Sequence, residues 1–463
     1  MSAPVEAGAR DTFTGSIRVR LRAPAVRRNQ ELVLLVGALL IGGTAMLLVQ
    51  LGAQGQPDGG MLLLLAGLGV LAVAFHIVLR ITAPEADPFL LPIAVALNGL
   101  GLAMITRIDI ADGSEGWDAG GVRQMAYTAL AMVLAGAVVL LLRNHRVLQR
   151  YRYLAMAASV GLLILPLLPI IGREVSGARV WIGLGPFSFQ PAELAKITLA
   201  IFFAGYLVTA RDSLSLVGRT VLGIRLPRLR DLGPILVVWL AAMGVIVFQR
   251  DLGTALLYFG LFLVMLYVAT GRASWIAIGV LMFAGGAVIA ATGLSYVRGR
   301  FDAWLNPFDP ANYEAIGGSY QLVQGLFGLA AGGLVGTGLG QGSPDIVPLA
   351  ESDYIIASLG EELGLIGLFA VLAMYLVFVS RGFRIGFAGQ DDFGRLLGVG
   401  LSFVVALQVF IVIGGVTRVV PLTGLTTPFL AAGGSSLLAN WIIVAILLRL
   451  SDAVRAQPRL VIG

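Results

Sequence analysis

Long apolar runs dominate this 463-residue chain and constrain its fold more than any other feature. About 20 consecutive apolar residues are enough to cross the hydrocarbon core of a bilayer as a helix. Twelve stretches approach this length, at residues 32–52, 60–80, 88–107, 122–143, 152–171, 191–210, 231–249, 253–270, 274–297, 353–380, 396–417 and 429–450. Only 13% of the residues are charged, whereas soluble domains have about 25%. The sequence therefore predicts an all-α polytopic membrane protein with about 12 transmembrane helices.

The distribution of arginine predicts how these helices are oriented. Arginine and lysine accumulate in the short cytoplasmic loops of membrane proteins. If the amino terminus is cytoplasmic, most of the arginines fall on the cytoplasmic side, with clusters at residues 10–28, 143–152 and 211–230. Both termini are then cytoplasmic. The longest polar segment between two apolar stretches, at about 298–352, becomes a large extracytoplasmic loop.

The residue types present exclude several kinds of site. Cysteine is absent, so disulfides and thiolate metal sites cannot form. Histidine occurs only at His76 and His145, and neither a Ser-His-Asp triad nor a histidine-based zinc site is expected. The net charge of +6 comes from arginines that flank apolar stretches. This arrangement suits anionic membrane lipids rather than nucleic acid. Carboxylates, arginines and backbone groups must therefore carry any polar chemistry.

One polar segment on the predicted outer side includes Arg179 and leads into the apolar stretch that begins near residue 191. Glu193 and Lys196 are three residues apart in that stretch and would project from one face of a helix. A charge within a bilayer costs at least ~2.5–3.5 kcal/mol and is usually functional or paired. Two interpretations stay open: a substrate-binding pair, or a structural ion pair that faces the helical bundle.

The 298–352 loop concentrates the polar residues that could carry chemistry. They include Arg298, Arg300, Asp309, Glu314, Tyr320 and Gln321. The planar guanidinium of arginine suits phosphate recognition, and glycine turns such as 332–342 let backbone N–H groups approach an anion. A carboxylate among them can take a proton from a hydroxyl or hold a divalent cation. Turns are needed in any outer loop, so the glycines alone are weak evidence.

Carboxylates also mark the starts of two further apolar stretches. Asp353 is the first residue of one stretch, and Glu361 and Glu362 lie within it. Adjacent carboxylates in an apolar run are costly unless their hydrogen-bonding capacity is satisfied. Glu361 and Glu362 are therefore either site residues or clamps for the outer loops. Asp251 precedes another stretch, as a helix cap or a site residue.

Taken in order, these segments resemble the SEDS family, the shape, elongation, division and sporulation proteins that include FtsW and RodA. The resemblance spans about 88–450 and depends on six separated motifs in the family's order, among them residues 190–196, Asp309-Pro310, residues 318–321 and residues 360–364. It implies a ten-helix core that polymerises lipid II into peptidoglycan strands in cell elongation or division. It also implies a class B penicillin-binding protein, a transpeptidase, as partner. The amino-acid sequence of the outer loop favours a RodA-like member.

On this resemblance the chain divides into four parts. Residues 1–30 form a cytoplasmic basic arm that can lie on anionic membrane lipids. Residues 31–86 form two additional N-terminal helices, residues 87–452 the SEDS core, and residues 453–463 a cytoplasmic tail. The implied location is the bacterial cytoplasmic (inner) membrane, with the active site on the extracytoplasmic side.

The sequence departs from the family's motifs at Val180, Arg250 and Leu349. A fourth departure affects the catalytic residue. The family's essential aspartate lies in an Asp-Pro pair just before Gly-x-Gly-Tyr-Gln. Asp309-Pro310 matches this pair, but five extra residues precede the matching Gly318–Gln321. Counting back without a gap puts Glu314 at the aspartate position. We favour Asp309 as the catalytic residue and keep Glu314 as the alternate.

The resemblance implies a glycosyl transfer. The catalytic carboxylate deprotonates the 4-hydroxyl of the acceptor sugar, which attacks the anomeric carbon of the donor and releases undecaprenyl pyrophosphate. The expected substrate-binding residues are Arg179, Glu193, Lys196, Arg298, Arg300, Tyr320, Gln321, Asp353 and Glu361. Mg²⁺ or Mn²⁺ is the expected cofactor, because a divalent cation would help to neutralise the leaving group.

Two rival functions belong to other classes. A flippase or transporter of lipid-linked precursors would be supported by inverted repeats and by polar groups at the middle of the membrane. No such repeat is apparent, and the polar segments gather on one predicted side. A scaffold for the crosslinking partner would leave the outward carboxylates and arginines unexplained.

Overall fold

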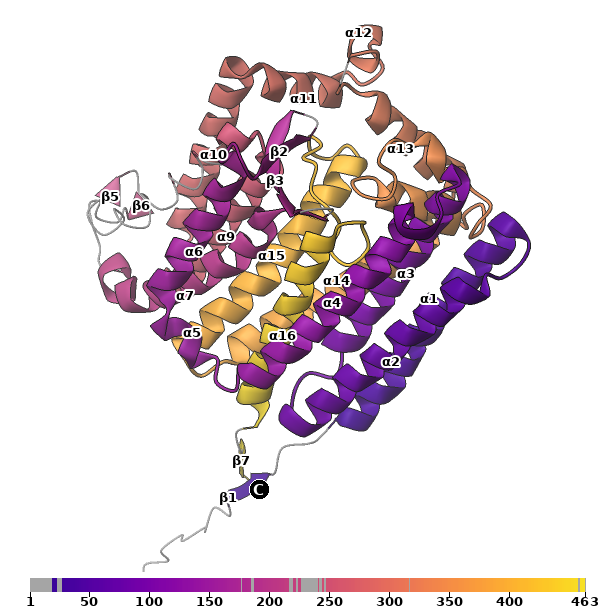
Figure 1. Ribbon diagram of the computed structural model, residues 1–463. Coiled ribbons are helices and arrows are strands. Elements are labelled where there is room, and N and C mark those ends of the chain that lie inside the picture. The colour runs from indigo at the N-terminus through magenta and orange to yellow at the C-terminus, as the bar shows by residue number, and fades with distance from the viewer. Residues whose placement is uncertain are drawn as a thin grey trace, which may run out of the picture.

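The computed structural model describes residues 19–22, 27–175, 177–184, 187–215, 220–221, 224–225, 240, 244, 247–315, 317–456 and 459–462. Long helices run side by side, and shorter elements cover one end of the bundle (Figure 1). Strands β1 (Val19–Arg22) and β7 (Arg459–Ile462) pair near the opposite end (Figure 1). We call the end that carries the short helices at Ser295–Leu305, Pro310–Tyr313 and Tyr320–Gly332 the loop face. Regions near both ends of the chain thus lie at the end remote from the loop face.

Ten helices in the described part of the chain are long and apolar enough to cross a membrane. They are α1 (Arg28–Gln54), α2 (Gly59–Thr82), α3 (Leu90–Asp112), α4 (Gly120–Leu141), α7 (Pro191–Ser215), α9 (Leu252–Thr270), α10 (Ser274–Gly293), α14 (Ile355–Ala388), α15 (Asp392–Val416) and α16 (Gly434–Arg455). The predicted fold class is confirmed.

Two of the twelve predicted spans are not among these ten helices. The stretch at 152–171 forms the shorter helix α6 (Arg152–Ile164), which tightens into a 3₁₀ turn at Leu165–Leu167. Pro166 ends the regular helix there because it lacks the backbone N–H needed for the next helical hydrogen bond. Apart from 240, 244 and 247–249, the stretch at 231–249 lies outside the described residues.

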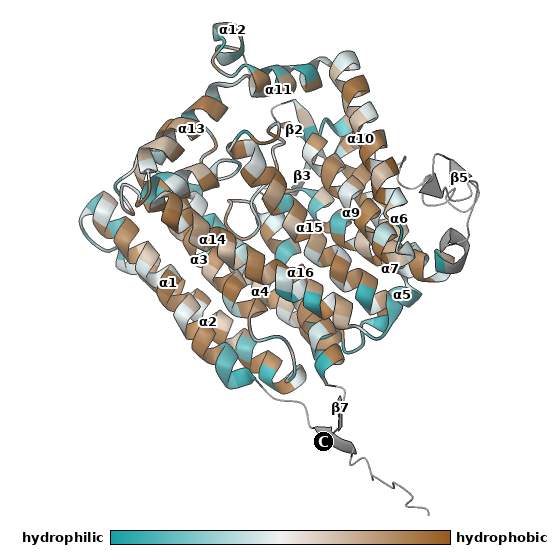
Figure 2. Ribbon diagram, turned by 180° about the vertical axis from the view of Figure 1, so that it is seen from behind, coloured by the Kyte–Doolittle hydropathy of each residue, from teal (hydrophilic) through white to brown (hydrophobic). Residues whose placement is uncertain are grey.

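The helices differ greatly in how much of their surface the protein covers. In the most apolar 18-residue segment of α3, 83% of the residues are buried. In the corresponding segment of α10, only 6% of the residues are buried. Hydrophobic colour follows the helices, and hydrophilic colour gathers near their ends and on the segment that contains α11 and α12 (Figure 2). Large apolar residues such as Leu281 and Ile289 on α10 are exposed. These surfaces match a protein whose periphery faces hydrocarbon.

The two N-terminal helices form a hairpin that packs on the rest of the bundle, α1 mainly along α3 and α2 mainly along α4. Near one end, Arg28 Nη1 donates to Glu31 Oε2 (2.6 Å), and His76 Nδ1 lies 2.7 Å from Glu31 Oε1. All three side chains are buried. Near the other end, a Cβ added to Gly52 would lie 3.0 Å from Gly340 Cα. The hairpin is therefore attached to the bundle near both of its ends.

A small sheet and short helices form the loop face (Figure 1). Strands β2 (Gly172–Val175), β3 (Ala178–Leu184) and β4 (Phe187–Phe189) make an antiparallel sheet in which β3 is central. The predicted 298–352 loop contains most of α11 (Ser295–Leu305), and α12 (Pro310–Tyr313), α13 (Tyr320–Gly332) and a 3₁₀ turn at Pro344–Ile346. The remaining short elements are a 3₁₀ turn at Gly116–Asp118, α5 (Arg146–Arg150), β5 (Thr220–Val221) and β6 (Ile224–Arg225).

Candidate functional site

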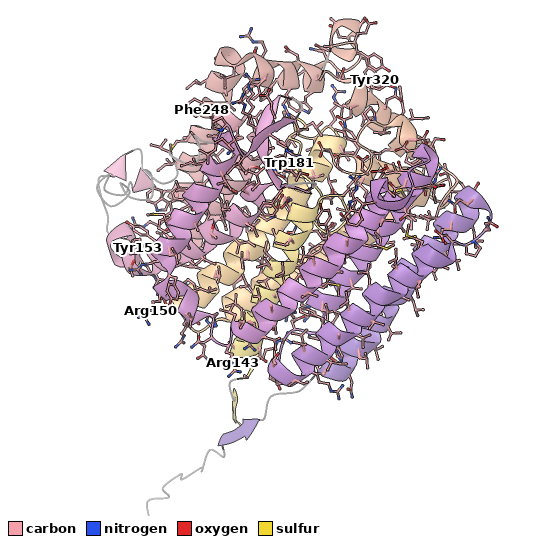
Figure 3. The ribbon with its side chains drawn as sticks, in the orientation of Figure 1. Arg143, Arg150, Tyr153, Trp181, Phe248 and Tyr320 are labelled. Carbon is pink, nitrogen blue, oxygen red and sulfur yellow. The ribbon has the colours of Figure 1, made fainter. Side chains whose placement is uncertain are left out.

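The predicted site residues lie at the loop face or in the helix turns just beneath it. Tyr320 and Trp181 lie at this face, whereas Arg143 and Arg150 lie near the opposite end (Figure 3). Five predicted site residues are exposed: Arg179, Arg298, Asp309, Glu314 and Tyr320. Six are buried or half-buried: Glu193, Lys196, Arg300, Gln321, Asp353 and Glu361. The predicted residues thus divide into an exposed and an inward group.

The first turns of α7 bury an ion pair. Lys196 Nζ donates to Glu193 Oε2 (2.6 Å) and to Gln408 Oε1 of α15 (2.9 Å). Gln408 in turn donates through Nε2 to the carbonyl oxygen of Thr426 (2.9 Å). The three-residue spacing predicted this pairing on one helix face, and α15 completes it. The pair faces the bundle and fixes the segment around Thr426.

Asp251 precedes α9 and acts as its N-cap. Its carboxylate accepts hydrogen bonds from the Thr254 backbone N–H (2.9 Å) and from the Thr254 hydroxyl (2.6 Å). Burial raises the pKa of Asp251, although the bonds from Thr254 and the charge of Arg300 oppose this shift, and Glu193 adds to it. Asp251 is thus both a helix cap and electrostatically coupled to two predicted site residues, a double role that the sequence left open.

Asp353 lies just before α14 and shares this environment. Burial raises the pKa of Asp353 to about 6; Arg300 opposes the shift, and the carboxylates of Glu351 and Asp251 add to it. Arg300 reaches inward from α11 and donates to the carbonyl oxygen of Leu422 (2.8 Å). We call Glu193, Lys196, Asp251, Arg300 and Asp353 the loop-face polar cluster.

The balance of charge in this cluster limits its chemistry. Three carboxylates accompany two cations, so the net charge that the cluster presents to a substrate depends on how many of its carboxyl groups are protonated. A carboxyl group whose pKa lies near 6 can exchange a proton close to neutral pH. Among the residues that the structure describes, no group of three or more His, Asp or Glu side chains is placed to hold a metal ion. The expected Mg²⁺ or Mn²⁺ stays a prediction.

Two residues beside the cluster were absent from the predicted site. Arg250 adopts a left-handed backbone conformation with φ 63°, which non-glycine residues rarely adopt. Its guanidinium carbon lies 5.9 Å from the centre of the Tyr296 ring. The Tyr296 hydroxyl is buried and has no hydrogen-bond partner among the described residues. The replacement of the family's usual proline by Arg250 was the only sequence signal for this arrangement.

Three members of the exposed group, Asp309, Glu314 and Tyr320, lie beside α12, which projects from the loop face (Figure 1). Asp309 is the N-cap of this four-residue helix, and its Oδ1 accepts from the Ala311 backbone N–H (2.9 Å). Glu314 follows the helix and is exposed. Tyr320 packs edge-on against Tyr313 with ring centres 5.2 Å apart. Both candidate catalytic carboxylates are therefore open to solvent at this end of the molecule.

Glu361 and Glu362 clamp the glycine-rich loop. Glu361 Oε1 accepts from the Ser343 backbone N–H (2.8 Å). Glu362 accepts from the backbone N–H of Gly340 (2.8 Å) and from Arg107 Nε (3.0 Å). These contacts match the structural interpretation of the two carboxylates. Gln321 has a similar local partner, because its Nε2 donates to the Pro348 carbonyl oxygen (2.6 Å).

Two predicted phosphate-binding arginines also have local partners. Arg298 donates to the carbonyl oxygens of Ala291 (3.3 Å) and Thr292 (2.7 Å), close to the end of α10. A cation is favourable there because helix carbonyls lack helical partners at a C-terminus. Arg179 Nε lies 3.0 Å from Glu174 Oε2 across the β2–β3 hairpin, and the two side chains are 58% and 50% exposed. Their substrate roles stay predictions.

A family model described as cell cycle protein, covering FtsW, RodA and SpoVE, matches residues 88–456, which is more than half of the chain. The chain belongs to the FtsW/RodA/SpoVE family. The resemblance inferred from its motifs is confirmed. The two N-terminal helices precede the matched residues.

Individual relatives extend this similarity beyond the matched residues. The peptidoglycan glycosyltransferase RodA of Mycobacterium bovis is 47% identical over 95% of both chains. The RodA of Mycobacterium leprae is 44% identical over 94% of this chain and 92% of its own. A probable peptidoglycan glycosyltransferase FtsW of Trichlorobacter lovleyi is 31% identical over 81% of this chain and 95% of its own.

Solved structures share the fold. A chain from a peptidoglycan synthase complex that coordinates polymerization and crosslinking matches with a TM-score of 0.61 and 25% identity, over 80% of this chain and 98% of that chain. The rod shape determining protein RodA of Thermus thermophilus matches with a TM-score of 0.54 and 25% identity, over 79% of this chain and 96% of that chain.

Proposed function

We infer that this chain is a peptidoglycan glycosyltransferase, a multi-pass membrane enzyme that polymerises lipid II into glycan strands in cell elongation or division. The observation that carries this function is the 47% identity, over 95% of both chains, to a RodA that bears this enzyme name. The carboxylates at the loop face supply the acid–base groups that glycosyl transfer requires. A membrane enzyme suits a substrate whose polyprenyl chain is dissolved in the bilayer.

The reaction joins two lipid-linked sugars. The acceptor's 4-hydroxyl oxygen bonds to the anomeric carbon of the donor as the bond to the diphosphate oxygen breaks. The hydroxyl proton passes to a carboxylate, and the diphosphate leaves with the bonding electron pair. A pyrophosphate is a good leaving group, so stabilisation of its charge matters more than protonation.

We assign the proton-accepting role to Asp309, with Glu314 as the alternate. Exposure at the loop face leaves both carboxylates accessible to a bulky sugar substrate. The hydrogen bond from the Ala311 backbone N–H to Asp309 Oδ1 orients the Asp309 carboxylate. The favoured residue also retains the Asp-Pro pair of the family motif. A positioned general base of this kind contributes about 10²–10⁴-fold to the rate.

Beneath these carboxylates, the loop-face polar cluster is the proposed site for the sugar and diphosphate portions of the substrate. Arg300 and Lys196 supply the buried positive charge. Asp353 supplies a carboxyl group that is half protonated at about pH 6, which limits the negative charge that an incoming diphosphate meets. Arg179 and Arg298 extend this positive charge to the exposed rim.

The loop face is proposed to be extracytoplasmic, as the distribution of arginine predicts. The paired strands β1 and β7 place both terminal regions at the other end of the bundle, which agrees with cytoplasmic termini. A class B penicillin-binding protein is the proposed partner. The matching synthase complex couples polymerization to crosslinking, and a transpeptidase of this class would crosslink the strands that this chain makes.

Steady-state polymerisation of lipid II by the purified full-length chain tests the catalytic assignment. Asp309→Asn is expected to lower the rate at least 100-fold, and Glu314→Gln to lower it less than tenfold. Asp302→Asn is the matched control, because Asp302 is another exposed carboxylate of the loop face, and it should retain the parent rate. Parent rates in Asp309→Asn with a large loss in Glu314→Gln would transfer the role to Glu314. Parent rates in both would refute the assignment.

A further inference from the structure

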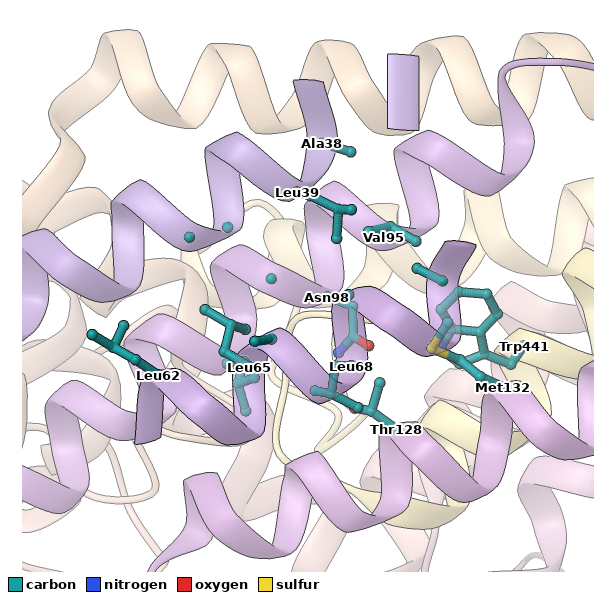
Figure 4. Close-up of a pocket in the computed structure, with 17 residues that line it drawn as sticks. Ala38, Leu39, Leu62, Leu65, Leu68, Val95, Asn98, Thr128, Met132 and Trp441 are labelled. Carbon is teal, nitrogen blue, oxygen red and sulfur yellow. The ribbon is translucent and has the colours of Figure 1, made fainter. Parts of the chain in front are cut away.

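A cavity of about 340 Å³ lies between the N-terminal hairpin and the family core. Residues of α1, α2, α3 and α4 line it, together with Trp441 of α16, which lies near Met132 (Figure 4). These are all helices long and apolar enough to cross a membrane. None of the predicted site residues lines the cavity. The cavity therefore lies apart from the site at the loop face.

The residues that line the cavity are almost all apolar. Aliphatic side chains and glycines make up most of it; Trp441 adds an indole whose buried N–H has no hydrogen-bond partner among the described residues, and the other polar exceptions are Asn98 and Thr128. Both of these already donate hydrogen bonds, Asn98 Nδ2 to the carbonyl oxygen of Phe429 (3.3 Å) and Thr128 Oγ1 to that of Gln124 (2.8 Å). No charged residue is part of the lining. An apolar chain without polar groups fits these walls.

The backbone of the hairpin explains why the space exists. A Cβ added to Gly42 would lie 3.1 Å from Gly99 Cα, so α1 and α3 touch closely at that point. One residue further along, a Cβ on Gly43 would meet nothing within 4 Å, and a Cβ on Gly69 of α2 would meet only Leu39 at 3.7 Å. Because α1 packs mainly on α3 and α2 mainly on α4, the hairpin straddles the two core helices. Gly43 and Gly69 leave the space between them open.

We propose that this cavity is a binding site for one acyl chain of a membrane phospholipid. The cavity is open to the outer surface of the hairpin, where Ala66 is exposed and Leu62 and Leu65 are half-buried, so an acyl chain of the surrounding bilayer can enter it. An apolar cavity of about 150 Å³ holds benzene, which scales to roughly a dozen carbons here. A straight acyl segment matches that volume. A polyprenyl chain carries methyl branches at regular intervals and needs a wider channel.

Photo-crosslinking of the full-length chain in lipid vesicles tests the proposal. The probe is a phosphatidylcholine with a diazirine midway along one acyl chain, and adducts are mapped by mass spectrometry. Lipids around the protein reach its exposed surface, so the informative adducts are those on Leu102, Met132 and Trp441, which line the cavity and are nearly inaccessible to solvent. Adducts on at least one of these three residues are expected in the parent protein.

Cavity-filling variants supply the comparison. Gly43→Leu and Gly69→Leu should each lower the yield of these inner adducts at least fivefold. Gly37→Leu and Gly67→Leu are matched controls on the same two helices, because a Cβ at either position meets nothing within 4 Å and neither residue lines the cavity. They should retain the parent yield. Absence of inner adducts in the parent, or equal yields in all four variants, would overturn the proposal. Inner adducts from a diazirine-labelled polyprenyl phosphate alone would also overturn it.

Discussion

Replacing Lys196 with methionine tests the structural role of the buried pair on α7. The side chains of Lys196 and Glu193 are only 1% and 6% exposed, and their charged atoms lie 2.6 Å apart. Removing the cation leaves the Glu193 carboxylate buried, with no opposite charge at that position. Breaking a buried pair from one side typically destabilises a protein by about 3–5 kcal/mol. We expect a loss of that size, because Gln408 can offer hydrogen bonds but no charge.

The free energy of unfolding in mixed detergent micelles, titrated with SDS, measures this loss. Glu193→Gln combined with Lys196→Met removes both charges and should recover most of the stability, with an interaction energy of about 2–3 kcal/mol in the double-mutant cycle. Arg179→Met is the matched control, since the Arg179–Glu174 pair is exposed, and exposed pairs contribute less than about 1 kcal/mol.

Polymerisation by the doubly substituted protein then separates the two roles. A stable but inactive double variant assigns the pair to substrate binding, whereas a stable and active one makes it structural. A decrease of less than about 1 kcal/mol in the free energy of unfolding of Lys196→Met would refute the reasoning, because a buried unpaired carboxylate should destabilise the protein by more than that.

Three further predictions use the same preparation. Because the pKa of Asp353 is raised to about 6, the folded protein holds this proton more tightly than the unfolded chain, and the free energy of unfolding should fall as pH rises from about 4 to 6; Asp353→Asn should lack that part of the slope. The chain has no cysteine, so an impermeant maleimide should label Ser343→Cys in spheroplasts but label Arg143→Cys only after permeabilisation, and the reverse pattern would invert the proposed topology. Gly52→Ala should destabilise by about 1–3 kcal/mol through overpacking, because its Cβ would lie 2.5 Å from the Leu339 carbonyl oxygen; Gly37→Ala, which meets open space, should be neutral or stabilising, and equal effects would contradict the contact.

Much of the fold follows from sequence because a membrane span is a local property. A run of about 20 apolar residues predicts a helix whatever it packs against, and ten of the predicted spans are present. The structure of the outer loop depends instead on short-range hydrogen bonds, such as those that make Asp309 the N-cap of a four-residue helix. The sequence predicted a large extracytoplasmic loop without assigning its secondary structure, and much of that segment folds into α11, α12 and α13.

The candidate site shows where sequence reasoning stops. Glu193 and Lys196 could be paired from their spacing because helix geometry fixes it. Asp251 and Asp353 are about a hundred residues apart, and only the packing of the bundle places both near Arg300. Arg298 and Arg300 looked equivalent in the sequence, yet one donates to carbonyls near the end of α10 and the other to Leu422. Which carbonyls an arginine reaches is decided by tertiary structure.

The most direct test of the proposed enzyme is the fate of lipid II in vesicles that contain only the purified chain. The reaction predicts glycan polymer together with one released undecaprenyl pyrophosphate for each sugar–sugar bond formed. Omitting the class B penicillin-binding protein should leave this chemistry detectable, because the carboxylates assigned to it belong to this chain. Movement of lipid II between the leaflets without polymer or released pyrophosphate would contradict the account and favour a lipid transporter.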